Sequence, residues 1–475
     1  MKGEDISYAA IMAQRAEIVQ ASAGIDYSRY VTGSLAFDYD RLLVDTGYEI
    51  DTVREIQRRT AVGDTPLVEL ENITALVRVI AKPGKGARIF IKDEAKNPSG
   101  SFKDRRASLS VQEAKKRGYV GVAAATSGNY GAAVASQAAK AGLRCIVVQE
   151  AFDSRDVAQP EIAEKTRACE AYGAEVLRLS VGPELFYVFL RVLKETNYFN
   201  ASLYSPYSIL GIETLGSELA MQMQAQVGRF PEVVIVTHAG GGNVTGTARG
   251  LQKAGAADTA VVAASVDLSG LYMASDRDFN RKSFTTGHTG FSIPFTTWPD
   301  RADMPRSAAR PLRYMDRFVT VTQGEVFYIT QVLAELEGLE RGPAGNTSLA
   351  AAFAIAQELD EDQTVVVQET EYTGAGKHPI AQLNLAKRMG ITVTRGDPRT
   401  SKPGQRIVIP IDPSQIAVVD VELNQLRRAY LRNALASLPP DARLSNVDLQ
   451  FLAAETRATE SYIQEAIDEL RGKTG

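Results

Sequence analysis

Lys103 lies in a sequence context that favours an amine able to form a Schiff base. A strand-like segment, 87–92, is followed by the turn-forming segment 97–101, and a helix is predicted from about Arg105 to Arg117. Helix N-termini attract anions through unpaired N–H groups. A partly desolvated lysine at such a position can lose its proton and attack an aldehyde. An isolated lysine at a helix start is more often simply solvated, so the interpretation needs further motifs.

Two further turns supply that support. Ala-Thr-Ser-Gly-Asn-Tyr-Gly at 125–131 and His-Ala-Gly-Gly-Gly-Asn-Val-Thr-Gly at 238–246 each follow an apolar run and precede a predicted helix. Consecutive glycines leave several N–H groups free to converge on a phosphate. One such turn is weak evidence, because tight strand-to-helix turns also use glycine. Three turns in this order indicate a binding site much more strongly.

The composition is that of an ordinary soluble globular protein. The 475 residues are enough for two or three domains, and apolar (44%) and charged (23%) residues occur at usual levels. A net charge of −4 gives no indication of nucleic-acid binding. No apolar run reaches the length of a membrane span, and residues 1–5 lack the apolar core of a signal peptide. These features predict a cytoplasmic protein.

Cysteine and histidine are too few and too dispersed for several kinds of site. Cys145 and Cys169 cannot form a disulfide framework or a four-ligand zinc site. Cys145 lies in an apolar strand-like run, so a buried structural thiol is preferred to a nucleophile there. The three histidines are widely separated, so we predict no metal site.

Apolar strand-like runs alternate with helix-like runs from about Gly63 onward, which indicates an α/β protein with a buried parallel sheet. Active-site loops are expected at the carboxyl ends of such strands. Strands are predicted near Leu67, 89–91, 120–125, 145–148, 175–179, 233–236, 261–265, 318–321 and 365–368.

At this point the chain resembles a known family. Ser-Gly-Ser-Phe-Lys-Asp-Arg at 99–105, Thr-Ser-Gly-Asn at 126–129 and the glycine-rich turn ending in Asn-Val-Thr-Gly are similar to motifs of the fold-type II pyridoxal-phosphate enzymes, and among these of threonine synthase-like proteins. The resemblance covers roughly 63–379. It implies a tryptophan synthase β-like fold with two open, twisted, mostly parallel sheets and flanking helices. In this chain a helical C-terminal tail follows that fold.

Four regions are expected on this basis. An N-terminal helical segment covers 1–62, and a larger phosphate-binding domain comprises 63–95 and 216–419. A smaller domain, 96–215, contains Lys103 and the Asn129 loop, and the helical tail covers 420–475. The alternation of strands and helices fails between Leu268 and Met315, where a substrate lid, a docking surface and a plain surface insertion are all compatible with the sequence.

The resemblance also implies the roles of individual residues. Lys103 is the lysine that binds pyridoxal phosphate, and it then serves as base or acid at the substrate's α carbon. Asn129 is expected to hydrogen-bond the pyridine 3-hydroxyl. The remaining expected contacts are Gly240, Gly241, Gly242, Asn243 and Val244 for the cofactor phosphate, and Ser99, Ser101 and Ser127 for the substrate.

The partner of the pyridine nitrogen has two candidates. Thr373-Gly-Ala-Gly follows a strand and resembles the family's Thr-Gly-His-Gly turn, whose hydroxyl meets that nitrogen. Glu369, at the end of the strand, is the rival, because a carboxylate would hold the nitrogen protonated. A third possibility is that Glu369 is simply solvated.

Two positions depart from the family pattern. Arg106 replaces a residue that is commonly glycine, and Gly342-Pro343 replaces a Glu-Pro pair. Instead of a role in the site, Arg105 and Arg106 could simply form ion pairs on the helix surface. Both departures weaken the case for an ordinary threonine synthase reaction.

Chain length, the segment 369–379 and the helical tail resemble the β subunits of 2-amino-4-oxopentanoate thiolases, a group that acts in ornithine breakdown. That resemblance implies coenzyme A-dependent cleavage to acetyl-CoA and alanine, a small α subunit and a homodimer of this chain. The alternatives are a threonine synthase, another pyridoxal-phosphate lyase that replaces β or γ groups, and a non-catalytic binding subunit. A non-catalytic subunit is disfavoured because Lys103, Asn129 and the glycine turn are all intact.

Overall fold

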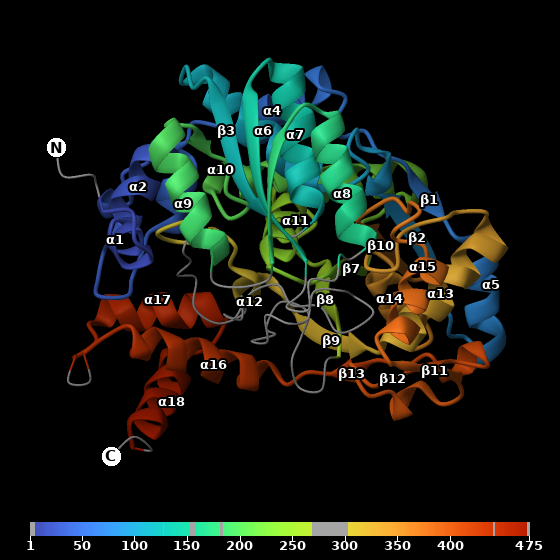
Figure 1. Ribbon diagram of the computed structural model, residues 1–475. Coiled ribbons are helices and arrows are strands. Elements are labelled where there is room, and N and C mark those ends of the chain that lie inside the picture. The colour runs from blue at the N-terminus through green and yellow to red at the C-terminus, as the bar shows by residue number, and fades with distance from the viewer. Residues whose placement is uncertain are drawn as a thin grey trace.

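Two open sheets form the core of the computed structural model, which describes residues 5–126, 128–152, 158, 160–180, 184–267, 303–439 and 442–472. The larger sheet has the order β1-β2-β10-β7-β8-β9-β13, and the smaller has the order β5-β4-β3-β6. Helices cover both sheets (Figure 1). The predicted α/β class, with open and mostly parallel sheets, is therefore confirmed.

The seven-stranded sheet is parallel except at its edges, where β1 runs antiparallel to β2 and β13 antiparallel to β9. Its central strands are buried along their whole length, which explains their continuous runs of valine and isoleucine. The strands are β1 (Leu67–Glu69), β2 (Arg88–Asp93), β7 (Val233–Thr237), β8 (Ala260–Val266), β9 (Arg317–Val321), β10 (Thr364–Glu369) and β13 (Val419–Asp420).

The four-stranded sheet is parallel throughout. It consists of β3 (Gly121–Thr126), β4 (Arg144–Phe152), β5 (Glu175–Ser180) and β6 (Phe199–Asn200), with helices α7 (Asn129–Ala141), α8 (Pro160–Ala171) and α9 (Glu184–Thr196) between the strands. Cys145 in β4 is buried, as predicted for a structural thiol, and Cys169 in α8 is buried as well.

Three helices that pack closely fix the geometry between the sheets: α6 (Lys103–Lys116), α10 (Pro206–Val227) and α11 (Gly242–Lys253). A Cβ at Gly211 of α10 would fall 3.0 Å from the backbone carbonyl carbon of Arg105 in α6. A Cβ at Gly250 of α11 would fall 2.9 Å from the carbonyl carbon of Glu213 in α10. Glycine at these positions lets the backbones touch, so the first residues of α6 and α11 are held relative to each other.

The remaining helices cover the large sheet or connect elements. They are α5 (Glu71–Ile80), α12 (Pro311–Tyr314), α13 (Gln323–Glu337), α14 (Thr347–Ala356) and α15 (Pro379–Arg388). A separate pair of parallel strands, β11 (Thr392–Arg395) and β12 (Arg406–Ile409), follows α15.

Helices at the two ends of the chain pack against each other. The N-terminal segment contains α1 (Tyr8–Ala13), α2 (Arg15–Ala23), α3 (Tyr39–Asp45) and α4 (Ile50–Arg59), and the tail contains α16 (Leu423–Ala436), α17 (Asn446–Thr456) and α18 (Glu460–Gly472). The Asp448 carboxylate in α17 accepts hydrogen bonds from the N–H groups of Leu35 (2.7 Å) and Ala36 (3.0 Å). Figure 1 shows the tail below the body of the molecule, with α17 on the side of α1.

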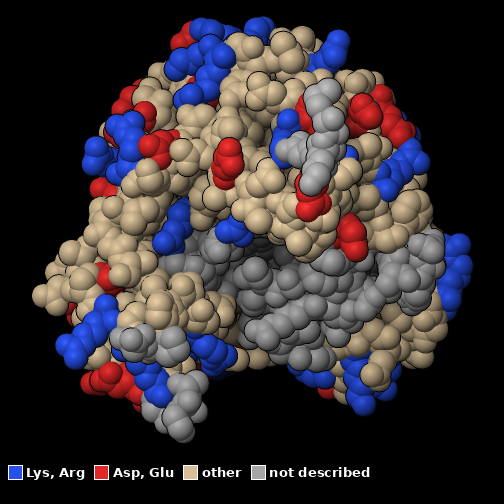
Figure 2. Space-filling model, turned by 60° about the vertical axis from the view of Figure 1, so that its left-hand side comes forward, with Lys and Arg blue, Asp and Glu red and all other residues tan. Residues whose placement is uncertain are grey.

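Positive and negative side chains are interspersed on the face shown in Figure 2. This agrees with the modest net charge. Among the described residues, no helix combines the length and apolar character needed to cross a membrane.

Candidate active site

The predicted turns meet at the carboxyl ends of strands from both sheets. Lys103 is the first residue of α6, two residues earlier than the predicted helix start, and it follows β2. Asn129 begins α7 after β3, and Gly242 begins α11 after β7. A fourth segment, 370–378, follows β10. We call these segments together the candidate site.

Lys103 has the electrostatic environment of a reactive amine. Its side chain is half-buried, and Nζ lies 4.4 Å from the centre of the Phe102 ring. Burial lowers the pKa of Lys103 to about 7, and the nearby cations Arg106 and Lys377 act in the same direction. Glu371 opposes them only in part. A large fraction of the amine is therefore neutral near pH 7 and can act as a nucleophile or base.

Backbone hydrogen bonds join the Lys103 turn to the segment after β10. Tyr372 N–H donates to Gly100 O (2.8 Å), and Phe102 N–H donates to Thr370 O (3.1 Å). Gly100 has a φ of +80°, and a Cβ there would fall 2.9 Å from Tyr372 Cγ. Glycine is thus needed both for the backbone conformation and for the close approach of the ring.

A buried ionic network anchors the start of α6. The Arg105 guanidinium binds Glu94 through Nε and Nη2, both at 2.7 Å, and binds Glu218 through Nη1 and Nη2, both at 3.1 Å. Lys92 also contacts Glu218. Arg105 and Glu94 are fully buried, so the alternative of a helix-surface ion pair is wrong for Arg105. The network fixes the turn that presents Lys103.

Asn129 is held by two charged residues that the sequence analysis did not single out. Its amide nitrogen donates to Glu371 Oε2, and its amide oxygen accepts from Lys377 Nζ (3.3 Å). Lys377 also contacts the Glu371 carboxylate. Burial alone would raise the pKa of Glu371, but Lys377 and Lys165 outweigh it and lower this pKa to about 2. Glu371 is therefore an anion that keeps the Asn129 amide in place.

Lys165 of α8 is a third lysine in the candidate site. It is buried, and its Nζ lies 4.4 Å from the centre of the Tyr372 ring, while Lys377 Nζ lies 4.6 Å from the same centre. Burial and the neighbouring Lys377 lower the pKa of Lys165. No motif in the sequence marks this lysine, because it reaches the site from a helix more than 200 residues away from Tyr372 along the chain.

Both candidates for the pyridine nitrogen carry a buried atom that lacks a hydrogen-bond partner among the described residues. These atoms are Thr373 Oγ1 and Glu369 Oε2. Glu369 is fully buried, so the possibility that it is simply solvated is wrong. Burial raises the pKa of Glu369 well above its usual range, although Glu371 N–H donates to its Oε1 (3.2 Å). Buried orphan polar atoms of this kind are typical of groups that bind a ligand.

The glycine turn after β7 forms a cradle in which Gly240, Gly241 and Gly242 contribute backbone and no side chains. Gly241 has a φ of +78°, and a Cβ there would fall 2.8 Å from Pro311 Cδ. A Cβ at Gly240 would fall 2.9 Å from Tyr204 Cζ. The first N–H groups of α11 have no partner within the helix. Asn243 and Val244, in this first turn, are buried. The arrangement fits a phosphate group.

The predicted substrate serines are engaged within the Lys103 turn. The Ser99 hydroxyl donates to Asp104 Oδ2 (2.6 Å), and Ser101 Oγ accepts from Lys103 N–H (3.3 Å). Ser127 lies outside the described residues. The roles of these three serines toward a substrate remain predictions.

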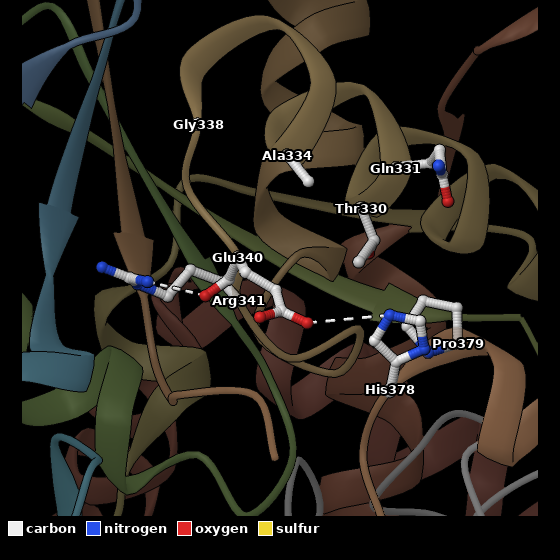
Figure 3. Close-up of a pocket in the computed structure, with 8 residues that line it drawn as sticks. All are labelled: Thr330, Gln331, Ala334, Gly338, Glu340, Arg341, His378 and Pro379. Atoms are coloured by element: carbon white, nitrogen blue, oxygen red, sulfur yellow. Dashed lines mark hydrogen bonds and ion pairs between the residues drawn. The ribbon is translucent and has the colours of Figure 1, made fainter. Parts of the chain in front are cut away.

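A surface pocket of about 210 Å³ lies beside the segment after β10 (Figure 3). It is lined from α13 by Thr330 and Ala334, and across from them by His378 and Pro379. Figure 3 shows His378 facing Glu340, with 3.6 Å between His378 Nε2 and Glu340 Oε1. Lys103, Asn129 and the glycine cradle do not line this pocket.

Taken together, the candidate site offers an amine with a lowered pKa, a phosphate cradle and a fixed amide, which suits an aldehyde that carries a phosphate group. In the described part of the chain, no group of three histidine, cysteine or acidic residues is arranged to hold a metal. Burial raises the pKa of the Cys169 thiol to about 12 and that of Cys145 further, so neither supplies a thiolate at neutral pH.

Comparison with known proteins identifies similar chains. A family model described as pyridoxal-phosphate dependent enzyme matches residues 58–371. A 2-amino-4-ketopentanoate thiolase beta subunit from an unidentified prokaryotic organism is 62% identical over 470 residues, which are 98% of this chain and 99% of that protein. One of the same name from Acetoanaerobium sticklandii is 61% identical over 469 residues, covering 99% and 100%.

More distant similarities are shorter or structural. A threonine synthase from Halalkalibacterium halodurans is 31% identical over 192 residues, covering 40% of this chain and 49% of that protein. The cysteine synthase of Entamoeba histolytica superimposes with a TM-score of 0.53 at 20% identity, covering 68% of this chain and 88% of that structure. At this level of identity the structural match bears on the fold alone.

Proposed function

Because the chain belongs to the pyridoxal-phosphate dependent enzymes, we propose that it cleaves 2-amino-4-oxopentanoate with coenzyme A to acetyl-CoA and alanine. The chain is an enzyme that uses pyridoxal phosphate, as its family does. The specific reaction is carried by one observation, the 61–62% identity over nearly the whole chain to two thiolase beta subunits. Their names contain ketopentanoate, which is the same acid as oxopentanoate. The reaction would place the enzyme in ornithine breakdown.

The candidate site supports cofactor binding with residues from both sheets. Bound pyridoxal phosphate supplies an electron sink for negative charge that develops next to the amino group of an amino acid. We assign Lys103 to its aldehyde carbon and the cradle at Gly240, Gly241 and Gly242 to its phosphate. Asn129 is assigned to the ring hydroxyl, and Glu371 and Lys377 position its amide.

Lys103 also moves protons on the substrate. With its lowered pKa the neutral amine removes the proton from Cα, and it later returns a proton to the same carbon. The bond between C3 and C4 breaks, and the acetyl group formed by C4 and C5 passes to the sulfur of coenzyme A. C3 takes up a proton and becomes the methyl group of alanine. The coenzyme A thiol is the attacking sulfur, so the reaction needs no cysteine nucleophile.

The partner of the pyridine nitrogen is either Thr373 or Glu369. The motif favours Thr373, and both residues carry a buried atom without a hydrogen-bond partner in the described part of the chain. A neutral hydroxyl would leave the nitrogen unprotonated, whereas Glu369, once ionised by a proton transfer, would hold it protonated and strengthen the electron sink.

The name of the two close relatives implies a second subunit, and we propose that a small α subunit completes the active enzyme. Coenzyme A is too large for a pocket shaped around a small amino acid, so its thiol must arrive through an opening that the partner helps to form. The candidate docking surfaces are the helical tail and the segment 276–294, which lies outside the described residues. A homodimer of this chain is also part of the proposal.

Threonine synthase activity is the second candidate. It is supported by a 31% identity that covers only 40% of the chain. Arg106 and Gly342 depart from the pattern of that group, which favours the thiolase reaction.

Product analysis tests the proposed function. The chain is co-expressed with the proposed small α subunit and supplied with 2-amino-4-oxopentanoate and coenzyme A. We expect acetyl-CoA and alanine in equal amounts, and neither product with Lys103→Ala. If neither product forms with the intact enzyme while O-phosphohomoserine is converted to threonine, the assignment moves to threonine synthase.

A further inference from the structure

Arg106 places a buried guanidinium against the glycine cradle. It lies in the first turn of α6, only 2% exposed, and a Cβ at Gly242 would fall 2.9 Å from its Cζ. Gly242 is the first residue of α11. The guanidinium is thus beside the end of the helix that carries partial positive charge. Arg106 is also close enough to Lys103 to lower the pKa of that amine.

Arg106 differs from the other buried arginines because it has no anionic partner among the described residues. Arg105 binds Glu94 and Glu218, Arg310 binds Glu455, and Arg341 binds Asp93. Arg106 instead donates from Nε to the Ser208 hydroxyl (2.7 Å) and from Nη2 to the Leu203 carbonyl oxygen. Its Nη1 donates no hydrogen bond to the described residues. Burial lowers the pKa of Arg106 to about 10, and no carboxylate opposes this shift.

A buried cation without a counter-charge is costly, and here it adds to the unpaired N–H groups of a helix N-terminus. Ser208 and Leu203 hold the guanidinium in place, and its Cζ lies 5.9 Å from the centre of the Tyr204 ring, but none of these partners carries a full negative charge. Arginine is the side chain best suited to bind phosphate with several donors at once. The alternative of a helix-surface ion pair is wrong for Arg106, because the residue is buried and makes no ion pair with the described residues.

We propose that Arg106 binds the phosphate group of pyridoxal phosphate at the glycine cradle and supplies the charge that neutralises it. The guanidinium and the first N–H groups of α11 would hold the phosphate dianion together. This role is additional to the backbone contacts assigned above. It depends on cofactor binding by the family and not on the thiolase reaction.

Coenzyme A also carries phosphates, but the cofactor is the better match. The cradle is closed by Tyr204, Pro311 and Arg106 itself, so it suits a single terminal phosphate on a small ring. Arg106 and Lys103 also lie only three residues apart, in the first turn of α6.

A comparison of pyridoxal phosphate with pyridoxal isolates the phosphate contact. Apoenzyme is titrated with each compound, and the dissociation constants are read from the visible absorption band. In Arg106→Gln we expect affinity for pyridoxal phosphate to fall about 10- to 100-fold, because a charge-assisted hydrogen bond is lost. Affinity for pyridoxal should change less than about threefold on the same reasoning. Arg106→Lys, which keeps the charge, should lose less.

Arg249→Gln is the matched control, because Arg249 lies two turns further along α11 and is already paired with Glu213. It should leave the ratio of the two affinities unchanged. If Arg106→Gln does not fold, Ser208→Ala provides a second test, since it removes only the hydroxyl that holds Nε. Ser208→Ala should also lower the affinity for pyridoxal phosphate relative to that for pyridoxal.

Two outcomes would overturn the proposal. Equal weakening of pyridoxal phosphate and pyridoxal would mean that Arg106 acts through the fold alone. An unchanged ratio, combined with weaker binding of coenzyme A but not of 3′-dephospho-coenzyme A, would assign Arg106 to the 3′-phosphate of coenzyme A. Neither outcome depends on whether alanine is formed, so the test is independent of the proposed reaction.

Discussion

At the scale of single residues, the chemistry depends on how burial and charge change the pKa of Lys103. Desolvation favours the neutral amine, and Arg106 and Lys377 add to this effect. Glu371 does not cancel it, because its negative charge is already engaged with Lys377 and Asn129. A lysine prepared in this way can attack an aldehyde at neutral pH without a separate base.

The lowered pKa predicts how cofactor uptake depends on pH. Only the neutral amine attacks, so the rate at which apoenzyme forms its visible band should rise up to about pH 7 and then level off. A lysine with an ordinary pKa near 10.4 would instead give a rate that rises about tenfold per pH unit up to pH 9. Stopped-flow absorbance distinguishes the two profiles, with n-butylamine as the unperturbed reference amine. A rate still rising steeply between pH 8 and 9 would contradict the assignment.

The choice between Thr373 and Glu369 can be made with two isosteric variants. If the Thr373 hydroxyl meets the pyridine nitrogen, Thr373→Val should lower turnover by about 10-fold or more, as expected for loss of one positioned hydrogen bond in the reaction. Glu369→Gln should then have a smaller effect, and both variants should keep the visible band. Steady-state kinetics measure the turnover of each variant, corrected for its cofactor occupancy. The reverse ranking transfers the role to Glu369.

Sequence reasoning found the residues that belong to local motifs and missed those that reach the site from elsewhere. Lys103, Asn129 and the glycine turn each lie where a strand gives way to a helix, so their positions could be predicted. Glu371, Lys165 and Lys377 gain their importance from contacts with one another and with Asn129. Glu371 and Lys377 are only six positions apart, but their contacts with Asn129 and Lys165 join residues more than 200 positions apart, and no spacing in the sequence indicates them.

At the scale of elements, the candidate site depends on three strand–turn–helix units whose helices begin at it. The α6, α10 and α11 helices touch through their backbones, so their first turns are fixed relative to each other. The nine strands predicted from apolar runs are present. Strands β6, β12 and β13 were missed. For β6 and β13 the reason is that each has only two residues and its pairing depends on a neighbour far along the chain.

Gly241 offers a test of the cradle that separates backbone strain from lost binding. Gly241→Ala places a Cβ at a φ of +78° and against Pro311, beside the proposed phosphate position. Gly338, at the end of α13, has a φ of +65° with open space around it. Both alanine variants should lose about 1 kcal/mol of stability from the backbone conformation, with some further loss from the Pro311 contact in Gly241→Ala.

Only Gly241→Ala should also lose cofactor affinity, by about 10-fold or more if one or two charge-assisted N–H contacts are disturbed. Urea unfolding of the apoenzyme and titration with pyridoxal phosphate measure the two effects separately. Full cofactor affinity in Gly241→Ala would give the turn another role.

At the scale of the whole molecule, the two ends of the chain stabilise each other. Asp448 of the tail binds two backbone N–H groups of the N-terminal segment and also accepts from the Ser445 hydroxyl (2.7 Å). Tyr39 and Phe451 stack beside this contact, with 6.4 Å between ring centres. The helical character of the tail was predicted, whereas its docking onto residues more than 400 positions earlier was not, because no periodicity encodes it.

Asp448→Ala should therefore destabilise the fold. Two buried N–H groups lose their acceptor, which costs about 1–3 kcal/mol for each group left unsatisfied. Asp468→Ala removes an exposed carboxylate whose one hydrogen-bond partner in the described part of the chain is Gln464 on the same helix, and it should have little effect. Urea denaturation of the apoenzyme measures both, and equal stabilities of the two variants would rule out the anchoring role.

The central claim is that Lys103 takes the proton from the substrate's α carbon during a thiolytic cleavage. The most direct measurement uses 2-amino-4-oxopentanoate that carries deuterium at Cα, with coenzyme A and the small subunit in ordinary water, and determines the isotope content of the alanine by mass spectrometry. Loss of most of the α-deuterium is predicted, because the Lys103 amine exchanges its protons with solvent before it returns one to Cα. Alanine that keeps all of its α-deuterium would contradict the account, because the cleavage would then proceed without proton removal at Cα.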